Sequence, residues 1–138
     1  MSTSDLDEIS ARLREQLLAA ARVATHRAYA PYSQFHVGAA VLTERGAIYT
    51  GCNVENTSYG LTNCAERTAI FNAVCAEGAA MRLRAVAVCS DPEGACPPCG
   101  ACRQVMLEFG PEALVIFAGP NGLEQQRVSQ LLPSAFCL

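Results

Sequence analysis

The chain has 138 residues, of which 51% are hydrophobic and only 17% are charged, and its formal net charge at pH 7 is -3. This length fits a single domain over residues 1–138. All ten basic residues are arginines scattered without a run, which argues against a nucleic-acid partner, because such a groove needs clustered positive charge to neutralise phosphates. Typical domains have ~25% charged residues. The lower fraction here predicts either that part of the surface is buried in an oligomer or that the protein is a compact, alanine-rich monomer.

The cellular compartment is predicted from the N-terminus and the cysteines. No charged segment followed by an apolar core opens the chain, and no apolar run approaches the ~18 residues of a membrane span. Without a secretory signal, the eight cysteines favour metal binding or reduced thiols over a disulfide framework. We therefore expect a cytoplasmic protein that has no membrane segment and no disulfide.

The N-terminal half predicts a helix followed by a strand pair. Ser4 is the expected N-cap, and apolar residues then recur every three or four positions to about residue 28. Pro31 ends the helix because the residue before a proline is disfavoured in helical geometry. Residues 35–42 are predicted to form a buried strand, and residues 47–52 its antiparallel partner across a turn. The small residues of the first strand allow a helix to lie close to the sheet.

Two further helices are predicted to begin at cysteines. Residues 64–77 carry a buried Ala/Ile face and end at Gly78. A strand over residues 83–89 and a loop dense in proline and glycine come next. The following helix begins near residue 99 and runs to residue 109, because prolines are tolerated before a helix but not inside it.

The C-terminal part is expected to complete a mixed sheet. Residues 112–118 form a central strand that is reached through a helical crossover and is therefore parallel to the strand before it. A short strand over residues 125–128 and a one-turn helix over residues 130–132 follow. Helices then fall on both faces of a five-stranded sheet, which predicts an α/β fold.

The strongest candidate site combines three cysteines with one glutamate. Zn²⁺ takes four tetrahedral ligands, and a site with only three protein ligands keeps the fourth position for water or substrate. Cys64, Cys99 and Cys102 are the expected ligands, and helix N-termini favour their thiolates. Glu66, two positions after Cys64, can act as general acid and base on a metal-bound water. A ligand followed by x-Glu and later by Pro-Cys-x-x-Cys resembles the signature of zinc-dependent nucleobase deaminases.

One ambiguity concerns Cys96. Cys96-Pro97-Pro98-Cys99 and Cys99-Gly100-Ala101-Cys102 are both Cys-x-x-Cys pairs, and a redox dithiol or a structural zinc knuckle could use the first. If a helix begins near Cys99, then Cys99 and Cys102 lie one turn apart on one face and Cys96 is a spare thiol. Cys96 as a fourth ligand would instead indicate a structural zinc or redox protein without catalysis.

Four segments stand in the order and approximate spacing seen in the cytidine deaminase family, in its small, zinc-dependent, homotetrameric class. They are Ala30-Pro31-Tyr32-Ser33-Gln34-Phe35-His36-Val37-Gly38-Ala39-Ala40, Gly51-Cys52-Asn53-Val54-Glu55-Asn56, Cys64-Ala65-Glu66-Arg67 and Pro98-Cys99-Gly100-Ala101-Cys102-Arg103-Gln104. The resemblance covers roughly residues 28–138. It implies a three-layer α/β/α fold with a mixed five-stranded sheet, one Zn²⁺ per subunit, and a homotetramer with active sites shared between subunits. The implied reaction is hydrolytic deamination of cytidine and deoxycytidine in pyrimidine salvage.

The resemblance also implies roles around the metal. Glu66 would shuttle protons between the zinc-activated water and the cytosine ring, and Arg67 would donate hydrogen bonds to the ligating sulfurs. Phe35 would stack against the base, and the backbone of Ala65 would hold the pyrimidine edge. For Arg67 a solvent-facing salt bridge is the alternative.

Four further substrate-binding residues follow from the same resemblance. Asn53 and Glu55 would bind the ribose hydroxyls, for which an amide and a carboxylate are suited; the alternative is a turn in which both cap backbone groups. Tyr59 and Phe136 would reach the active site of a neighbouring subunit, unless they serve core or interface packing.

Two related deaminases remain as alternatives. An enzyme of the blasticidin S type would share the zinc site, but Asn53-Val54-Glu55-Asn56 favours ordinary ribose or deoxyribose. An editing deaminase acting on polynucleotides is disfavoured by the acidic charge balance and the lack of a basic patch.

Overall fold

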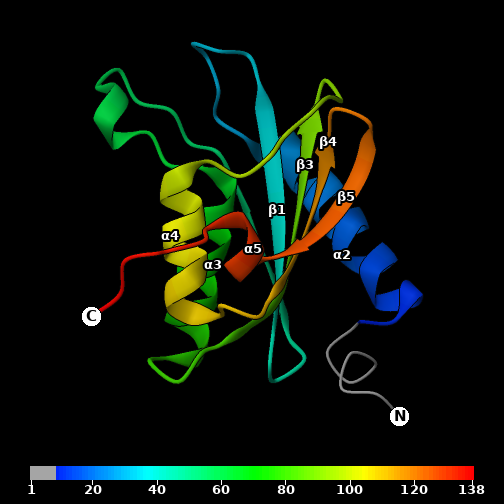
Figure 1. Cartoon of the computed structure of the whole chain (residues 1–138). Helices are drawn as coiled ribbons and strands as arrows, with labels where there is room; N and C mark the ends of the chain where they lie inside the picture. The colour runs from blue at the N-terminus through cyan, green and yellow to red at the C-terminus, as the bar shows by residue number, and fades with distance from the viewer. Residues whose placement is uncertain (1–8) are drawn as a thin grey trace.

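The computed structural model describes residues 9–138, which form a five-stranded mixed sheet in the order β2-β1-β3-β4-β5 (Figure 1). β1 is antiparallel to both β2 and β3, β3 is parallel to β4, and β4 is antiparallel to β5. The strands are β1 (His36–Thr43), β2 (Ile48–Cys52), β3 (Leu83–Asp91), β4 (Leu114–Gly119) and β5 (Gly122–Arg127). The single parallel pair, β3 and β4, flanks the helical crossover, as the sequence predicted.

Helices cover both faces of the sheet (Figure 1), which confirms the predicted three-layer fold. The helices are α2 (Ala11–Ala24), α3 (Ala65–Glu77), α4 (Gly100–Phe109) and the single turn α5 (Val128–Leu131). α2 lies on one face, and α3, α4 and α5 lie on the other. Among the described residues, none of these helices combines the length and apolarity required to cross a bilayer.

The central strands are buried on both faces, so successive side chains point alternately into two hydrophobic cores, one on each side of the sheet. In β1, Ala40 and Leu42 pack with α2, whereas Ala39 and Val41 belong to the core beneath α3 and α4. This alternation follows from the two-residue repeat of a strand. It explains why β1 and β3 appear in the sequence as nearly continuous apolar runs.

The ends of α2 differ from expectation. The expected N-cap Ser4 lies outside the described residues. α2 itself begins after Ser10, whose Oγ accepts a hydrogen bond from the Leu13 amide at 3.1 Å. At its other end the α-helix stops at Ala24 and tightens into a 3-10 turn, η1 (Thr25–Arg27), in which the Thr25 hydroxyl donates to the Arg22 carbonyl. The prediction of an α-helix continuing to residue 28 was therefore wrong by one turn.

Two glycines let helices approach the sheet from opposite sides. A Cβ at Gly38 would lie 2.1 Å from the Ala21 carbonyl oxygen of α2. A Cβ at Gly51 would lie 2.3 Å from the Ala69 amide nitrogen of α3. Both contacts are closer than a side chain can tolerate, so α2 and α3 hold their positions only because these residues are glycine.

The remaining boundaries follow the sequence closely. α3 and α4 begin directly after Cys64 and Cys99, and Gly78 ends α3 with a φ of 82°. β5 starts earlier than expected, because Gly122 adopts a φ of 118° and turns the chain back along β4 at once.

Candidate active site

The N-terminal ends of α3 and α4 lie at the same end of the sheet (Figure 1). Cys64 caps α3 and Cys99 caps α4, and both have extended backbone geometry. The first amides of each helix lack intrahelical partners and carry the positive end of the helix dipole. Two such ends therefore favour negative charge on the sulfurs placed there.

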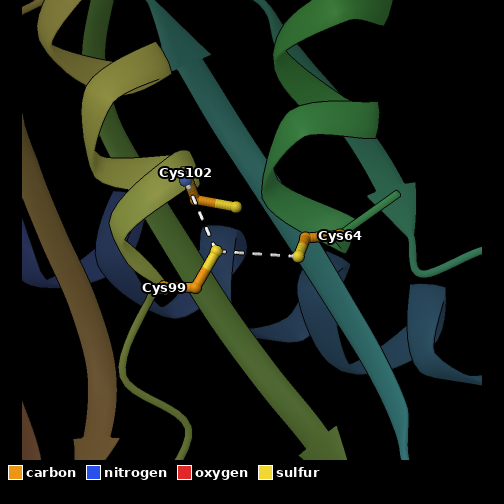
Figure 2. Close-up of side chains that lie close together, drawn as sticks. All are labelled: Cys64, Cys99 and Cys102. Atoms are coloured by element: carbon orange, nitrogen blue, oxygen red, sulfur yellow. Dashed lines mark hydrogen bonds between the residues drawn. The ribbon is translucent and has the colours of Figure 1, made fainter. Parts of the chain in front are cut away.

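Three thiols meet at this point (Figure 2). The sulfurs of Cys64, Cys99 and Cys102 all lie within 4.8 Å of one another, and those of Cys64 and Cys99 are 3.8 Å apart. The amide of Cys102 donates to the sulfur of Cys99 at 3.5 Å. Zn–S bonds of about 2.3 Å in a tetrahedron separate two sulfurs by roughly 3.8 Å. The donor set and its spacing fit Zn²⁺ with one coordination position left open.

The charge of the cluster is concentrated on Cys64. Its pKa is lowered to about 5, first by a hydrogen bond from the Cys102 thiol and then by Arg67, against the effect of burial. Nη2 of Arg67 donates to the Cys64 sulfur at 3.2 Å. The same bond to Cys64, together with burial, raises the pKa of Cys102. Arg67 thus contacts a ligand sulfur as the resemblance implied.

Glu66 is a buried acid beside the cluster. It stands in the first turn of α3 and is only 5% exposed. Burial raises its pKa to about 7, and the negative charge of Cys64 adds to the increase. A carboxyl group in this state can hold or release a proton near neutral pH, as a general acid and base must. Ala65, whose backbone was predicted to hold the base, is fully buried at the start of the same turn.

The Asn53 side chain forms two hydrogen bonds to the backbone at the start of β1. Its Oδ1 accepts from the Val37 amide at 2.8 Å, and its Nδ2 donates to the Phe35 carbonyl at 2.8 Å. Asn53 is buried, whereas Phe35 is 37% exposed. Asn53 therefore fixes the backbone on both sides of His36, directly after Phe35.

Glu55 accepts hydrogen bonds from three donors. Oε1 accepts from the amides of Tyr32 at 2.9 Å and Ser33 at 3.2 Å, and Oε2 accepts from the Ser33 hydroxyl at 2.5 Å. These bonds, with the Ser33 hydroxyl the largest contribution, lower the pKa of Glu55. Glu55 also lines a cavity of about 330 Å³ together with Tyr32, Ser33, Tyr59 and Thr62.

Tyr59 and Phe136 lie on the surface of the single chain. They are 77% and 72% exposed. The Tyr59 ring packs edge to face against Tyr32, with ring centroids 6.3 Å apart. The Phe136 carbonyl accepts from the Gln104 side chain at 3.0 Å, which fastens the C-terminal tail to α4.

Two residues of the site were not predicted from the sequence. The Ser33 hydroxyl contacts Glu55 and also accepts from the Phe35 amide at 3.1 Å. Arg103 donates from Nε to the Pro98 carbonyl at 2.8 Å and from Nη1 to the Leu131 carbonyl at 2.9 Å. Both stand inside segments that resemble motifs of the family, but spacing alone does not reveal such long-range contacts.

Cys96 lies outside the sulfur cluster. The three sulfurs within 4.8 Å of one another do not include it. Burial, followed by the negative charges of Glu66 and the neighbouring thiols, raises its pKa to about 12. Its amide donates to the Ala118 carbonyl at 2.8 Å, which ties the loop before α4 to the end of β4.

Known proteins with similar sequences and structures share one description. Residues 11–118 match the family model of the cytidine and deoxycytidylate deaminase zinc-binding region. A cytidine deaminase from Sporosarcina psychrophila is 48% identical over 124 residues, which cover 88% of this chain and 90% of that protein. A cytidine deaminase from Mycobacterium tuberculosis is 50% identical over 112 residues, 80% of each chain.

Solved structures agree with the sequence matches. The crystal structure of a cytidine deaminase from Mycobacterium tuberculosis superposes with a TM-score of 0.81 at 44% identity, covering 91% of this chain and 98% of the other. That of a cytidine deaminase from Burkholderia pseudomallei gives a TM-score of 0.79 at 47% identity, covering 88% and 98%.

Proposed function

This chain belongs to the cytidine and deoxycytidylate deaminase family, and from that premise we propose that it binds one Zn²⁺ per subunit and hydrolyses cytidine and deoxycytidine to uridine and deoxyuridine with release of ammonia. The observation that carries this proposal is the sulfur spacing of 3.8 Å beside the buried Glu66. A three-sulfur site with an open position and an adjacent acid suits hydrolysis rather than a purely structural metal.

Each residue of the site has a separate role in the proposed reaction. Cys64, Cys99 and Cys102 hold the metal, which when bound supplies Lewis-acid activation of a water molecule. Glu66 accepts a proton from the attacking water and delivers it to N3 of the cytosine ring, which makes C4 electrophilic. Glu66 then transfers a proton to the departing amino group, so that one water is consumed and one ammonia is released. The Ala65 backbone holds the pyrimidine edge, and Phe35 stacks against the ring.

A nucleoside suits the sugar end of the pocket better than a nucleotide. The Glu55 carboxylate lies at a cavity wall and, with a lowered pKa, is negatively charged at neutral pH. It can accept a hydrogen bond from a ribose hydroxyl, and Asn53 supports the same loop. A phosphate group at this position would face like charge. The scattered arginines likewise disfavour a polynucleotide substrate.

The exposed aromatic residues support a homotetramer with shared active sites. Tyr59 and Phe136 are largely exposed to solvent, and so is Leu61, which is 71% exposed. Apolar surface of this kind is typical of protein interfaces. In the proposed assembly, Tyr59 and Phe136 reach the pocket of a neighbouring subunit and complete its walls.

The proposed setting is pyrimidine salvage in the cytoplasm. All eight cysteines are unpaired, and three of them are grouped as metal ligands. Unpaired thiols persist in reducing compartments and are oxidised to disulfides in secreted proteins. A nucleoside deaminase belongs where free nucleosides are recycled.

The proposed reaction is tested with purified protein and cytidine by following the loss of cytosine absorbance, with and without a zinc chelator. We expect turnover to uridine that disappears as zinc is removed. Glu66→Gln should keep the zinc and lose activity by about 10²- to 10⁴-fold, the usual contribution of a general acid and base. Zinc-loaded wild-type protein without turnover on cytidine or deoxycytidine would move the substrate to a modified nucleoside, as in the blasticidin S type.

A further inference from the structure

The Ser33 hydroxyl lies between two groups assigned to the substrate pocket. Its oxygen is 2.5 Å from Oε2 of Glu55 and 3.1 Å from the amide nitrogen of Phe35. A serine hydroxyl offers one proton and two lone pairs. Because a carboxylate can only accept, the proton goes to Glu55, and a lone pair remains for the Phe35 amide. One side chain therefore holds both groups at once.

The backbone of Phe35 is held by two hydrogen bonds, one at its amide and one at its carbonyl. Ser33 holds its amide, and Nδ2 of Asn53 donates to its carbonyl at 2.8 Å. Between Ser33 and Phe35, Gln34 has a φ of 56°, a left-handed conformation that is unfavourable for a residue with a side chain. The Gln34 amide donates to the Ala30 carbonyl at 3.0 Å, which closes the turn. Such a conformation persists only where surrounding contacts enforce it.

Glu55 is oriented by the same segment. Its Oε1 is occupied by the amides of Tyr32 and Ser33, and its Oε2 by the Ser33 hydroxyl. The backbone bonds alone would hold one oxygen. The hydroxyl bond fixes the second oxygen, and with it the plane of the carboxylate and the direction of the lone pairs that remain for a ligand in the cavity.

We propose that Ser33 is a positioning residue, which locks the Glu55 carboxylate and Phe35 into a single rigid unit and so sets recognition of the sugar hydroxyls. This inference rests on the proposed function, because it assigns Ser33 a role in the same nucleoside pocket. A serine that served only to shape the turn would accept from the Phe35 amide, and its bond to Glu55 would be dispensable. The two roles differ in what they do to substrates that lack sugar hydroxyls.

The test compares cytidine with 2′,3′-dideoxycytidine as substrates of the wild-type, Ser33→Ala and Ser33→Thr proteins. Ser33→Ala should lower kcat/KM for cytidine roughly 10- to 100-fold, as expected for loss of a hydrogen bond to a charged group. The loss should appear mainly in KM. The same variant should lower kcat/KM for the dideoxy substrate much less, so the preference for cytidine falls. Ser33→Thr keeps the hydroxyl and should restore most of the preference.

Ser10→Ala is the matched control. It removes a serine hydroxyl that caps α2, and loss of such a cap lowers the stability of the fold. We expect it to lower the melting temperature without changing the ratio between the two substrates. This separates a loss of sugar recognition from a general loss of stability.

Calorimetric binding of uridine and 2′,3′-dideoxyuridine gives a readout that does not require turnover. Wild-type turnover of cytidine with an unchanged substrate preference in Ser33→Ala would overturn the role of Ser33 and leave the proposed function standing. Wild-type protein that prefers uridine over its dideoxy analogue, loses this preference in Ser33→Ala, and deaminates neither cytidine nor deoxycytidine would overturn the proposed function alone. Wild-type protein that binds neither nucleoside would contradict both.

Discussion

Arg67 in the first turn of α3 donates from Nη2 to the sulfur of Cys64, the N-cap of that helix, at 3.2 Å. Three thiolates around a divalent cation would leave a net negative centre, and the guanidinium supplies a fixed positive charge against it. The Nε of Arg67 is buried and has no hydrogen-bond partner among the described residues. Arg67 therefore acts mainly through Nη2, which contacts the sulfur of Cys64.

Replacing Arg67 with glutamine should weaken zinc binding. Loss of a hydrogen bond to a metal-ligating group typically costs about 10- to 100-fold in metal affinity. We expect faster transfer of zinc to a chromogenic chelator. Arg82→Gln is the control, because Arg82 donates to carbonyls of its own loop, at Ala79 and Met81. Equal zinc release from both variants would contradict a role for Arg67 in holding the ligand.

Replacing Arg103 with methionine should loosen the approach to Cys99. Arg103 joins the Pro98 carbonyl, directly before a ligand, to Leu131 at the end of α5. Loss of these bonds should destabilise the protein by about 1–3 kcal/mol and speed zinc release. Lysine should not rescue it, because an ammonium lacks the planar fork that reaches two carbonyls.

The control for Arg103 is Arg127→Met. Arg127 donates to the Glu112 carbonyl at 2.8 Å and makes a similar bond outside the metal loop. Thermal unfolding should reveal a loss of stability in both variants, whereas the chelator assay should detect faster zinc release only for Arg103→Met.

Replacing Gly51 with alanine should strongly destabilise the fold. The new Cβ would lie 2.3 Å from the Ala69 amide nitrogen, so α3 would have to move away from β2. Overpacking of this kind costs about 1–3 kcal/mol or more. Gly60→Ala is the control, because its Cβ would meet nothing within 4 Å. Melting temperatures compare the two, and a Gly51 variant as stable as the Gly60 variant would contradict this packing.

Stability should depend on pH through Glu55. Its pKa in the folded protein lies below its ordinary value of 4.5, chiefly because of the Ser33 hydroxyl. A lowered folded pKa means that the native state favours the carboxylate. The stabilisation is therefore complete above the ordinary pKa and is lost as the pH falls through the folded pKa. Glu55→Gln should lack this dependence, so the difference in unfolding free energy between the two proteins should shrink on acidification. A constant difference would contradict the assignment.

Mixing two inactive variants should restore activity if sites are shared. Tyr59→Ala should damage a neighbour's site, and Glu66→Gln should inactivate its own. In a mixed assembly, some sites combine an intact Glu66 with an intact Tyr59 from another subunit. We expect activity to reappear after the two proteins are dissociated and reassembled together. Light scattering would measure the oligomeric state, and a monomer would rule out this arrangement.

Much of the metal site could be predicted because its parts are local in sequence. Cys64 and Cys99 are helix N-caps, and Pro98 before Cys99 marks where α4 can begin. Periodicity and turn residues then located the strands to within a few residues. The helical crossover predicted that β3 and β4 are parallel, whereas the order of all five strands in the sheet was not predicted.

The proposed sugar end of the pocket was harder to predict. The bonds of Glu55 to Tyr32 and Ser33 span 23 and 22 residues, and the bond from Val37 to Asn53 spans 16. Such contacts connect two loops, or a loop to the start of β1, and leave no periodic pattern in the sequence. The family resemblance predicted that Asn53 and Glu55 bind the sugar, with capping of backbone groups as the alternative, and the structure shows that both side chains do bond backbone groups.

The attachment of the C-terminal tail has a practical consequence for anyone who immobilises or labels this protein. Gln104, two residues after Cys102, donates a hydrogen bond to the Phe136 carbonyl. This bond holds the tail where it runs across α4 (Figure 1). The start of α2 lies instead at the end of the molecule opposite the N-terminal ends of α3 and α4. A tether or fluorophore joined at the start of α2 lies at the end of the molecule away from the sulfur cluster, whereas one joined to the tail pulls on α4, which contains Cys102 and has Cys99 as its N-cap.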